Sequence, residues 1–264
     1  METTDILFEK RGHVALATFH RPEALNAFRQ ATLRDFLSIL DEVEADPSLR
    51  VLVLTGTGRA FSAGIDLKEI GQSAEHAPAL KQIYTDLQTT QDVTRRMVRM
   101  PKVILSAVNG LAVGIGVEIG LASDIRLAAE NASFTFAEVK RALFETNGVM
   151  YILPRLVGQG RALHMLLTGE TIAAREALSA GLVTRVLPQE QLLDTALEIA
   201  NTIAANAPLS VRLVKQVMQR AYDLDLEGVM QLEVDGMLQC YNSEDLLEGI
   251  RSFVEKRPPN YQGR

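Results

Sequence analysis

The order of elements along the sequence predicts an α/β fold, with a parallel sheet covered by helices and a helical C-terminal region after it. The first observation is a set of short apolar runs, typical of buried strands. They lie at 14–19, 51–54, 103–108 and 124–128. The second is that segments with a helical spacing of apolar residues separate these runs. The third is a change of character near residue 159, after which almost every segment has helical periodicity.

Helices are expected between the strands at 32–46, 80–98 and 114–123, with a polar loop at 71–80. In the first helix the apolar residues fall on one face, and Asp46-Pro47 ends it. The later helices are expected at 159–168, 173–180, 189–206, 208–222, 226–240 and 243–256, with one strand among them at 182–187. We therefore divide the chain into an α/β core, residues 1–200, and a helical region, residues 201–264.

Composition excludes several classes of partner. The chain has 264 residues, 47% of them hydrophobic, which is too apolar for a disordered protein. Its net charge of -6 and lack of a basic face argue against nucleic acid. Glu118 and Asp124 interrupt the most apolar region, so we expect no membrane span. The first residues lack the features of a signal peptide, and we expect a cytoplasmic protein.

Cysteine and histidine spacing predicts neither a disulfide nor a metal site. Cys240 is the single cysteine, so an internal disulfide cannot form. The four histidines are scattered, and no HExxH, CxxC or EF-hand spacing is present. We expect no bound metal.

Three segments carry the residues suited to chemistry, at 60–67, 108–118 and 134–138. Two of them place glycines and small residues where a strand ends, and glycine lets a backbone N–H approach a ligand closely. A helix starting near Gly114 would point free N–H groups at such a ligand. Glu118 lies in an otherwise apolar stretch, so it must be paired, exposed or functional. Asp66 is expected to cap a helix.

The chain resembles the enoyl-CoA hydratase/isomerase family, also called crotonases, over nearly its whole length. The resemblance is carried by an ordered set of segments: Asn26-Ala27-Phe28, Ser62-Ala63-Gly64-Ile65-Asp66, Val108-Asn109-Gly110, Asp124, Leu167-Thr168-Gly169, Ala180-Gly181-Leu182-Val183 and Phe253-Val254-Glu255-Lys256-Arg257. It implies a spiral of ββα units followed by a helical C-terminal region. In this family that region builds trimers, commonly paired into hexamers, so a homotrimer or homohexamer is expected.

The resemblance also implies roles for four residues acting on an acyl-CoA thioester. The backbone N–H groups of Ile65 and Ile115 would polarise the thioester carbonyl as an oxyanion hole. Glu118 and Glu138 match the family's two glutamates, three residues after Ile115 and twenty further on. Glu118 would deprotonate water for attack at the β-carbon, and Glu138 would deliver the α-proton. Coenzyme A is then a substrate handle, and no cofactor is expected.

Further residues are expected to contact the substrate by resemblance. The adenine and phosphates of coenzyme A would lie near Ala24, Asn26, Ala27 and Phe28, and the thioester near Ala63, Gly64 and Asp66. Lys256 would contact a phosphate as a point charge.

Two departures from the family's pattern bear on the reaction. Hydratases of the family usually have three glycines where this chain has Gly114-Ile115-Gly116, and the larger side chain would narrow the acyl pocket. A Gly/Pro-rich loop is replaced by residues 142–148, which add a third carboxylate, Glu145. Dienoyl-CoA isomerases of the family carry an extra acid close to this point. Glu145 thus weakens a pure hydratase interpretation. Hydration stays favoured because Glu118 and Glu138 match both glutamate positions, with enoyl-CoA or dienoyl-CoA isomerisation as the alternative.

Two other classes of function stay open at this stage. A Rossmann dinucleotide site is suggested by Gly114-Ile115-Gly116, but Ile119 stands where the third glycine belongs. A noncatalytic family member that binds acyl-CoA or RNA is the second. The acidic charge argues against RNA, and the two glutamates argue against lost catalysis.

Overall fold

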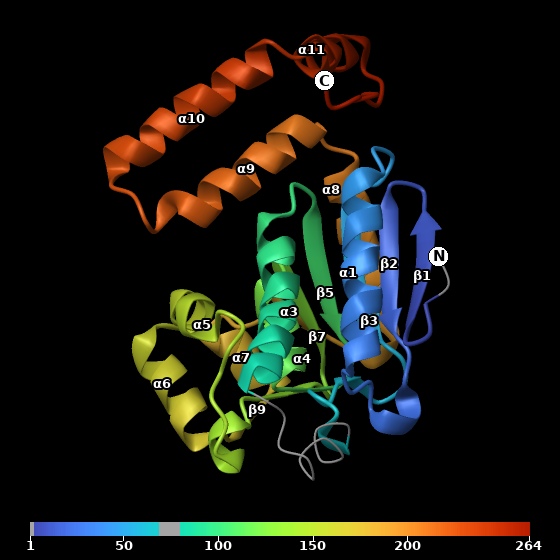
Figure 1. The fold of residues 1–264 in the computed structure, drawn as a ribbon. Helices are drawn as coiled ribbons and strands as arrows, with labels where there is room; N and C mark the ends of the chain where they lie inside the picture. The colour runs from blue at the N-terminus through green and yellow to red at the C-terminus, as the bar shows by residue number, and fades with distance from the viewer. Residues whose placement is uncertain (1–2, 69–79) are drawn as a thin grey trace.

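A six-stranded sheet forms the centre of the computed structural model, which describes residues 3–68 and 80–264 (Figure 1). Its strand order is β1-β2-β3-β5-β7-β10, and β1 is antiparallel to β2 while the other neighbours are parallel. The strands are β1 (Ile6–Arg11), β2 (Val14–Phe19), β3 (Val51–Gly56), β5 (Val103–Val108), β7 (Ile125–Ala129) and β10 (Arg185–Leu187). Parallel strands need covered faces, which accounts for the apolar runs in the sequence.

A second sheet of four short strands follows the ends of the long ones. It contains β4 (Ala60–Ser62), β6 (Leu111–Val113), β8 (Ser133–Thr135) and β9 (Thr171–Ala173), and only β9 runs antiparallel to its neighbour. Long strand, short strand and helix recur as a unit, as in β5, β6 and α4 (Ile115–Ala122). This spiral of ββα units and the helices after it confirm the predicted fold class.

Helices cover both faces of the first sheet (Figure 1). α1 (Gln30–Ala45) and α3 (Leu80–Arg99) lie in front of it, and α8 (Gln189–Ala204) packs behind it against β2, β3, β5 and β7. The predicted apolar face of α1 is buried, and its Phe36 ring packs edge-on against Phe19, 5.6 Å away. Phe28 and Phe61 pack on the same Phe19 ring, at 4.9 and 5.2 Å. This aromatic cluster fixes the segment before α1 against β4.

Three helices extend the chain beyond the sheets. They are α9 (Pro208–Ala221), α10 (Leu226–Tyr241) and α11 (Glu244–Glu255), at the top of Figure 1. The buried Lys215 of α9 forms an ion pair with Asp124 at 2.7 Å, which holds α9 on the core. The division of the chain at residue 200 stays a prediction. Among the described residues, no helix combines the length and apolarity that crossing a membrane requires.

The remaining elements show where local patterns mislead. α6 (Gln159–Thr168) and α7 (Ala174–Ala180) are as expected, but α5 (Val149–Val157) was not predicted because Pro154 lies inside it. The strand expected at 182–187 begins only at Arg185. The Leu182 N–H donates to Ala177 O at 2.8 Å and closes α7, so it is not free to join the sheet. The loop expected at 71–80 lies outside the described residues except for Leu80, which begins α3.

Candidate active site

Two backbone segments meet at the site, the loop after β4 and the turn between β6 and α4. Gly64 has a φ of +96°, and a Cβ atom there would lie 2.9 Å from the Val113 carbonyl oxygen. Only glycine therefore fits between the two segments. Ile65 follows Gly64 directly, and Ile115 lies two residues after Val113, so the fold brings the two predicted N–H donors into neighbouring turns.

The Ile65 N–H is left free by the way this segment pairs. Ile65 forms a parallel bridge with Phe28, in which Phe28 N–H donates to Gly64 O at 2.7 Å and Asp66 N–H donates to Phe28 O at 2.8 Å. A parallel bridge uses the groups on either side of Ile65, so its own N–H points away from Phe28. This N–H has no acceptor among the described residues.

The Ile115 N–H is free for a different reason. Ile115 is the first residue of α4, and the first N–H groups of a helix have no partner within it. The helical bonding begins where Glu118 N–H donates to Gly114 O at 3.0 Å. The Ile115 side chain is buried in the core, so the isoleucine does not block its own N–H. Two free donors on touching segments can serve one oxygen atom.

Glu118 and Glu138 lie beside these donors. The Glu118 side chain is 4% exposed, and its Oε2 accepts a hydrogen bond from Asn147 Nδ2. Burial raises the pKa of Glu118, the Asn147 hydrogen bond opposes that rise, and the charge of Glu138 adds to it. Glu138 begins the short helix η2 (Glu138–Arg141), and a Cβ at Gly114 would lie 2.5 Å from its Oε1. The Glu138 carboxyl therefore lies against the start of α4.

Glu145 joins the two glutamates from the loop after η2. It is 5% exposed, and neither carboxyl oxygen has a hydrogen-bond partner among the described residues. Burial, together with the carboxyl groups of Glu138 and Glu118, raises the pKa of Glu145 to about 10. Glu145 is thus neutral at pH 7. We refer to Glu118, Glu138, Glu145 and Asn147 as the acidic pocket.

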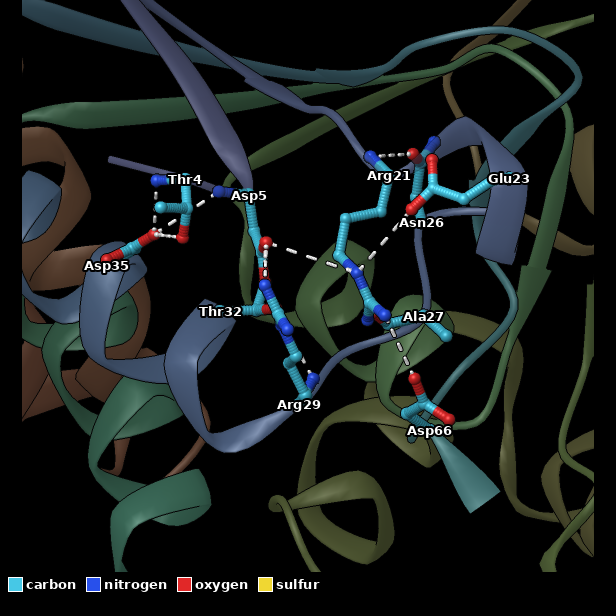
Figure 2. A network of polar contacts seen from close by, with 10 residues as sticks. All are labelled: Thr4, Asp5, Arg21, Glu23, Asn26, Ala27, Arg29, Thr32, Asp35 and Asp66. Atoms are coloured by element: carbon cyan, nitrogen blue, oxygen red, sulfur yellow. Dashed lines mark hydrogen bonds and ion pairs between the residues drawn. The ribbon is translucent and has the colours of Figure 1, made fainter. Parts of the chain in front are cut away.

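Arg21 ties together the segments expected to bind the substrate (Figure 2). Its Nη1 donates to Ala27 O at 2.6 Å, and its Nη2 pairs with Asp66 Oδ2 at 3.1 Å. Its backbone N–H donates to Asn26 Oδ1 at 2.9 Å, and Asn26 Nδ2 donates to Ala60 O at 2.8 Å. The turn at residues 24–28 is therefore locked to the segment around Ile65. Sequence reasoning missed Arg21, because an arginine before a proline carries no signal of its own.

Arg21 also lies beside the buried Asp5, with its Nε 4.0 Å from Asp5 Oδ1 (Figure 2). Arg29 holds the buried Asp5 through two bonds of 2.7 and 2.8 Å, and the Thr32 hydroxyl donates to the same carboxylate. Asp5, Arg21, Arg29, Thr32 and Asp66 together are named the arginine network.

The structure limits how the other predicted binding residues can act. Asn26, Ala27 and Phe28 are buried, so a ligand near this turn would meet the half-buried Ala24. Asp66 Oδ1 accepts from Lys68 N–H at 3.1 Å, as a helix cap does. The exposed Lys256 follows α11, which lies at the opposite end of the molecule from α4 (Figure 1). Within one chain, Lys256 is not brought to the site.

Comparison with known proteins gives this geometry its context. Residues 9–264 match the family model described as enoyl-CoA hydratase/isomerase. The chain is 41% identical over 262 residues to (E)-benzylidenesuccinyl-CoA hydratase of Thauera aromatica, covering 98% of this chain and 99% of that one. It is 36% identical over 258 residues to short-chain-enoyl-CoA hydratase of Clostridium acetobutylicum, covering 97% of each.

A solved structure agrees with these matches. The crystal structure of an enoyl-CoA hydratase from Bacillus anthracis superposes with a TM-score of 0.93 at 35% identity, covering 99% of this chain and 100% of that one. The chain belongs to the enoyl-CoA hydratase/isomerase family, as its resemblance implied. The family comprises both activities that the sequence left open, so the choice between them depends on the site.

Proposed function

We propose that this protein is an enoyl-CoA hydratase, which adds water across the 2,3 double bond of an enoyl-CoA thioester. The observation that carries this is the meeting of two free backbone N–H groups with two carboxyl groups, Glu118 and Glu138. The first pair suits a thioester oxygen that gains negative charge, and the second suits proton transfer to and from neighbouring carbons.

The proposed reaction conserves atoms and electrons without a redox partner. Glu118 takes a proton from water while the oxygen bonds to the β-carbon, and the double-bond electrons move to the α-carbon and thioester oxygen. Ile65 and Ile115 N–H groups stabilise that charge, and losing one such donor typically costs roughly 3 kcal/mol. Glu138 then delivers a proton to the α-carbon. No cofactor is needed, because the acyl group is neither oxidised nor reduced overall.

Isomerisation is the second candidate, and Glu145 is the observation that favours it. Moving a double bond requires a proton to leave one carbon and return to another, which Glu138 could perform alone. Glu145 lies close enough to Glu138 for that carboxyl group to raise the pKa of Glu145, and burial acts in the same direction and keeps Glu145 neutral. An acid with this placement could return the proton at a distant carbon.

A panel of thioesters separates the two activities. Purified protein is incubated with crotonyl-CoA, longer 2-enoyl-CoA, 3-enoyl-CoA and 2,4-dienoyl-CoA, and the products are identified by mass spectrometry. Hydration adds the mass of one water, whereas isomerisation leaves the mass unchanged. Water addition to a 2-enoyl-CoA as the fastest reaction supports the proposal. Double-bond movement without water addition contradicts it.

We also propose assembly into a trimer or hexamer. Helices α9 to α11 expose many large apolar side chains in one chain, among them Met218, Tyr222, Leu226, Met230 and Phe253. Exposed apolar area of this kind marks an interaction surface. Light scattering at micromolar concentration should give a mass of three or six chains, and a stable monomer would contradict this assembly.

A further inference from the structure

Buried oxygen atoms without a hydrogen-bond donor gather in one place. Among the described residues, the buried side-chain nitrogen and oxygen atoms that lack a partner are Glu138 Oε2, both carboxyl oxygens of Glu145, and Asn147 Oδ1. All four belong to the acidic pocket. A buried acceptor without a donor destabilises the fold, so natural proteins seldom collect such atoms without a functional reason.

Asn147 brings an amide donor into this group. Its side chain is 3% exposed, and its Nδ2 donates to Glu118 Oε2. The reverse amide orientation would place Oδ1 against a carboxylate oxygen, so the chemistry itself fixes the orientation. With Nδ2 on Glu118, Oδ1 is left as a free acceptor inside the pocket.

The loop that carries Asn147 is fixed from both sides. Gln91 of α3 donates from Nε2 to Thr146 O at 2.8 Å, immediately before Asn147. Gly148, immediately after it, has a φ of +79° and is the N-cap of α5. The amide is therefore held by the backbone and does not depend on the glutamate for its position.

Among the described residues, no cation acts on Glu118. Glu138 from η2 and Glu145 from the following loop act on it. No ion pair among the described residues includes any of the three glutamates. Burial and the charge of Glu138 thus favour the neutral form of this base. Hydrogen bonds from Asn147, Glu145 and the Thr146 backbone favour its ionised form, the Asn147 bond most strongly.

We propose that Asn147 is the positioning residue that keeps the Glu118 carboxylate oriented and ionised for attack by water. This role rests on the proposed function, because it assigns Glu118 as the base. Protonated Glu145 acts in the same direction more weakly, because its hydrogen bond to Glu118 also favours the ionised form of that base.

The test compares a substitution that removes the Asn147 donor with one that exchanges one neutral donor for another. The low-pH limb of kcat/KM for crotonyl-CoA hydration reports ionisation of the base in the free enzyme. Asn147→Ala should move this limb to higher pH by about one unit, since a hydrogen bond to a charged group is lost. Glu145→Gln keeps a neutral hydrogen-bond donor beside Glu118, so it should move the limb much less. A general disturbance of the pocket would move the limb similarly in both variants.

Gln91→Ala is the matched control. It loosens the same loop but keeps the Asn147 amide as a possible donor to Glu118, so it should lower thermal stability and move the limb less than Asn147→Ala does. If Asn147→Ala fails to fold, the isosteric Asn147→Asp is used in its place. This variant also lacks the amide donor, so it should move the low-pH limb to higher pH. Circular dichroism checks the fold of each variant.

A readout that does not depend on turnover separates failure of this inference from failure of the proposed function. Infrared titration of ligand-free protein follows the protonated-carboxyl band, with the Glu118 signal assigned as the part lost in Glu118→Gln. If Asn147→Ala raises the pH at which Glu118 ionises, the inference stands even if crotonyl-CoA is not hydrated. If the limb and the titration are unchanged in Asn147→Ala, or if Glu145→Gln shifts the limb upward as far as Asn147→Ala does, the inference is overturned.

Discussion

The arginine network and the acidic pocket contain the same kinds of buried carboxyl group in opposite surroundings. In the arginine network, Arg29 pairs with Asp5 and Arg21 pairs with Asp66, each within 3.1 Å (Figure 2). In the acidic pocket, Glu118 has an amide as its donor, and Glu145 has no donor among the described residues.

The difference separates a structural use of buried charge from a functional one. A carboxylate that already has its donors holds two segments together and has no capacity left for a ligand. A carboxyl group that lacks donors leaves its oxygen atoms for water, substrate or a proton, and its pKa moves accordingly. The arginine network thus holds the backbone that presents Ile65, while the acidic pocket supplies the groups that would react.

The largest effect is expected from removing a reacting carboxyl group. Glu118→Gln and Glu138→Gln should each reduce crotonyl-CoA hydration by about 10²–10⁴, because the amide matches the size of the acid but cannot transfer its proton. Glu118→Gln should spare any isomerisation comparatively. Steady-state rates with folding checked by circular dichroism measure this. Exposed Glu130→Gln is the control, and unchanged hydration in Glu118→Gln would exclude the two-glutamate mechanism.

Breaking the arginine network should instead reduce stability. Burial alone would raise the pKa of Asp5, but hydrogen bonds from Arg29 and Thr32 lower it overall. Ionised Asp5 therefore stabilises the fold at any pH above the pKa of an unfolded aspartate. That stabilisation is lost as the pH falls through the lowered pKa of Asp5 in the native state. Asp5→Asn should cost about 3 kcal/mol at pH 7, measured by denaturant unfolding. A shifted pH optimum of the folded variant would show that the network belongs to the site.

Glu145 should affect stability with the opposite sign. Its raised pKa means that the native state holds a proton that the unfolded chain releases near pH 4.5, so native stability falls as pH rises toward about 10. Glu145→Gln removes this cost. The gain in unfolding free energy over the wild type should grow from pH 6 to pH 9, by at most about 1.4 kcal/mol per pH unit. The thermal midpoint of the variant should therefore exceed that of the wild type by more at pH 9 than at pH 6. A difference in thermal midpoint that stays constant from pH 6 to pH 9 would contradict a neutral, buried Glu145.

A smaller effect is expected where the two regions connect. Arg21→Lys keeps the charge but loses the planar fork that reaches Ala27 O and Asp66 together. The Ile65 segment should then be held less firmly, and hydration should fall by about tenfold or less, mainly through kcat. Steady-state kinetics test this, and a fall comparable to that of Glu118→Gln would mean that Arg21 acts on the substrate itself.

The fold could be predicted from the sequence because its main signals are local. Buried strands and amphipathic helices recur in order, and the boundaries of α6 agree to the residue. The misses come from long-range context. Pro154 is tolerated inside α5, and the three-residue strands β4, β6, β8 and β9 are too short to show a period.

The candidate site could be predicted only in part for a related reason. Glu118 is conspicuous as a lone acid in an apolar stretch. Ile65, Ile115 and Glu138 were assigned through the family resemblance, and the Ile65 N–H is free because of a long-range bridge to Phe28. Asn147 and Arg21 are ordinary residues in ordinary loops. Their importance comes from the partners that folding places beside them, Glu118 in one case and Asp66 in the other.

A crystal structure of Glu118→Gln with unreacted crotonyl-CoA would test the proposed site most directly. We expect the thioester oxygen to lie about 2.7–3.1 Å from both the Ile65 and the Ile115 backbone nitrogens, with the β-carbon facing residue 118. The α-carbon should face Glu138. A thioester oxygen bound elsewhere, or either N–H bonded to another part of the chain in that complex, would contradict the oxyanion hole and with it the proposed hydration mechanism.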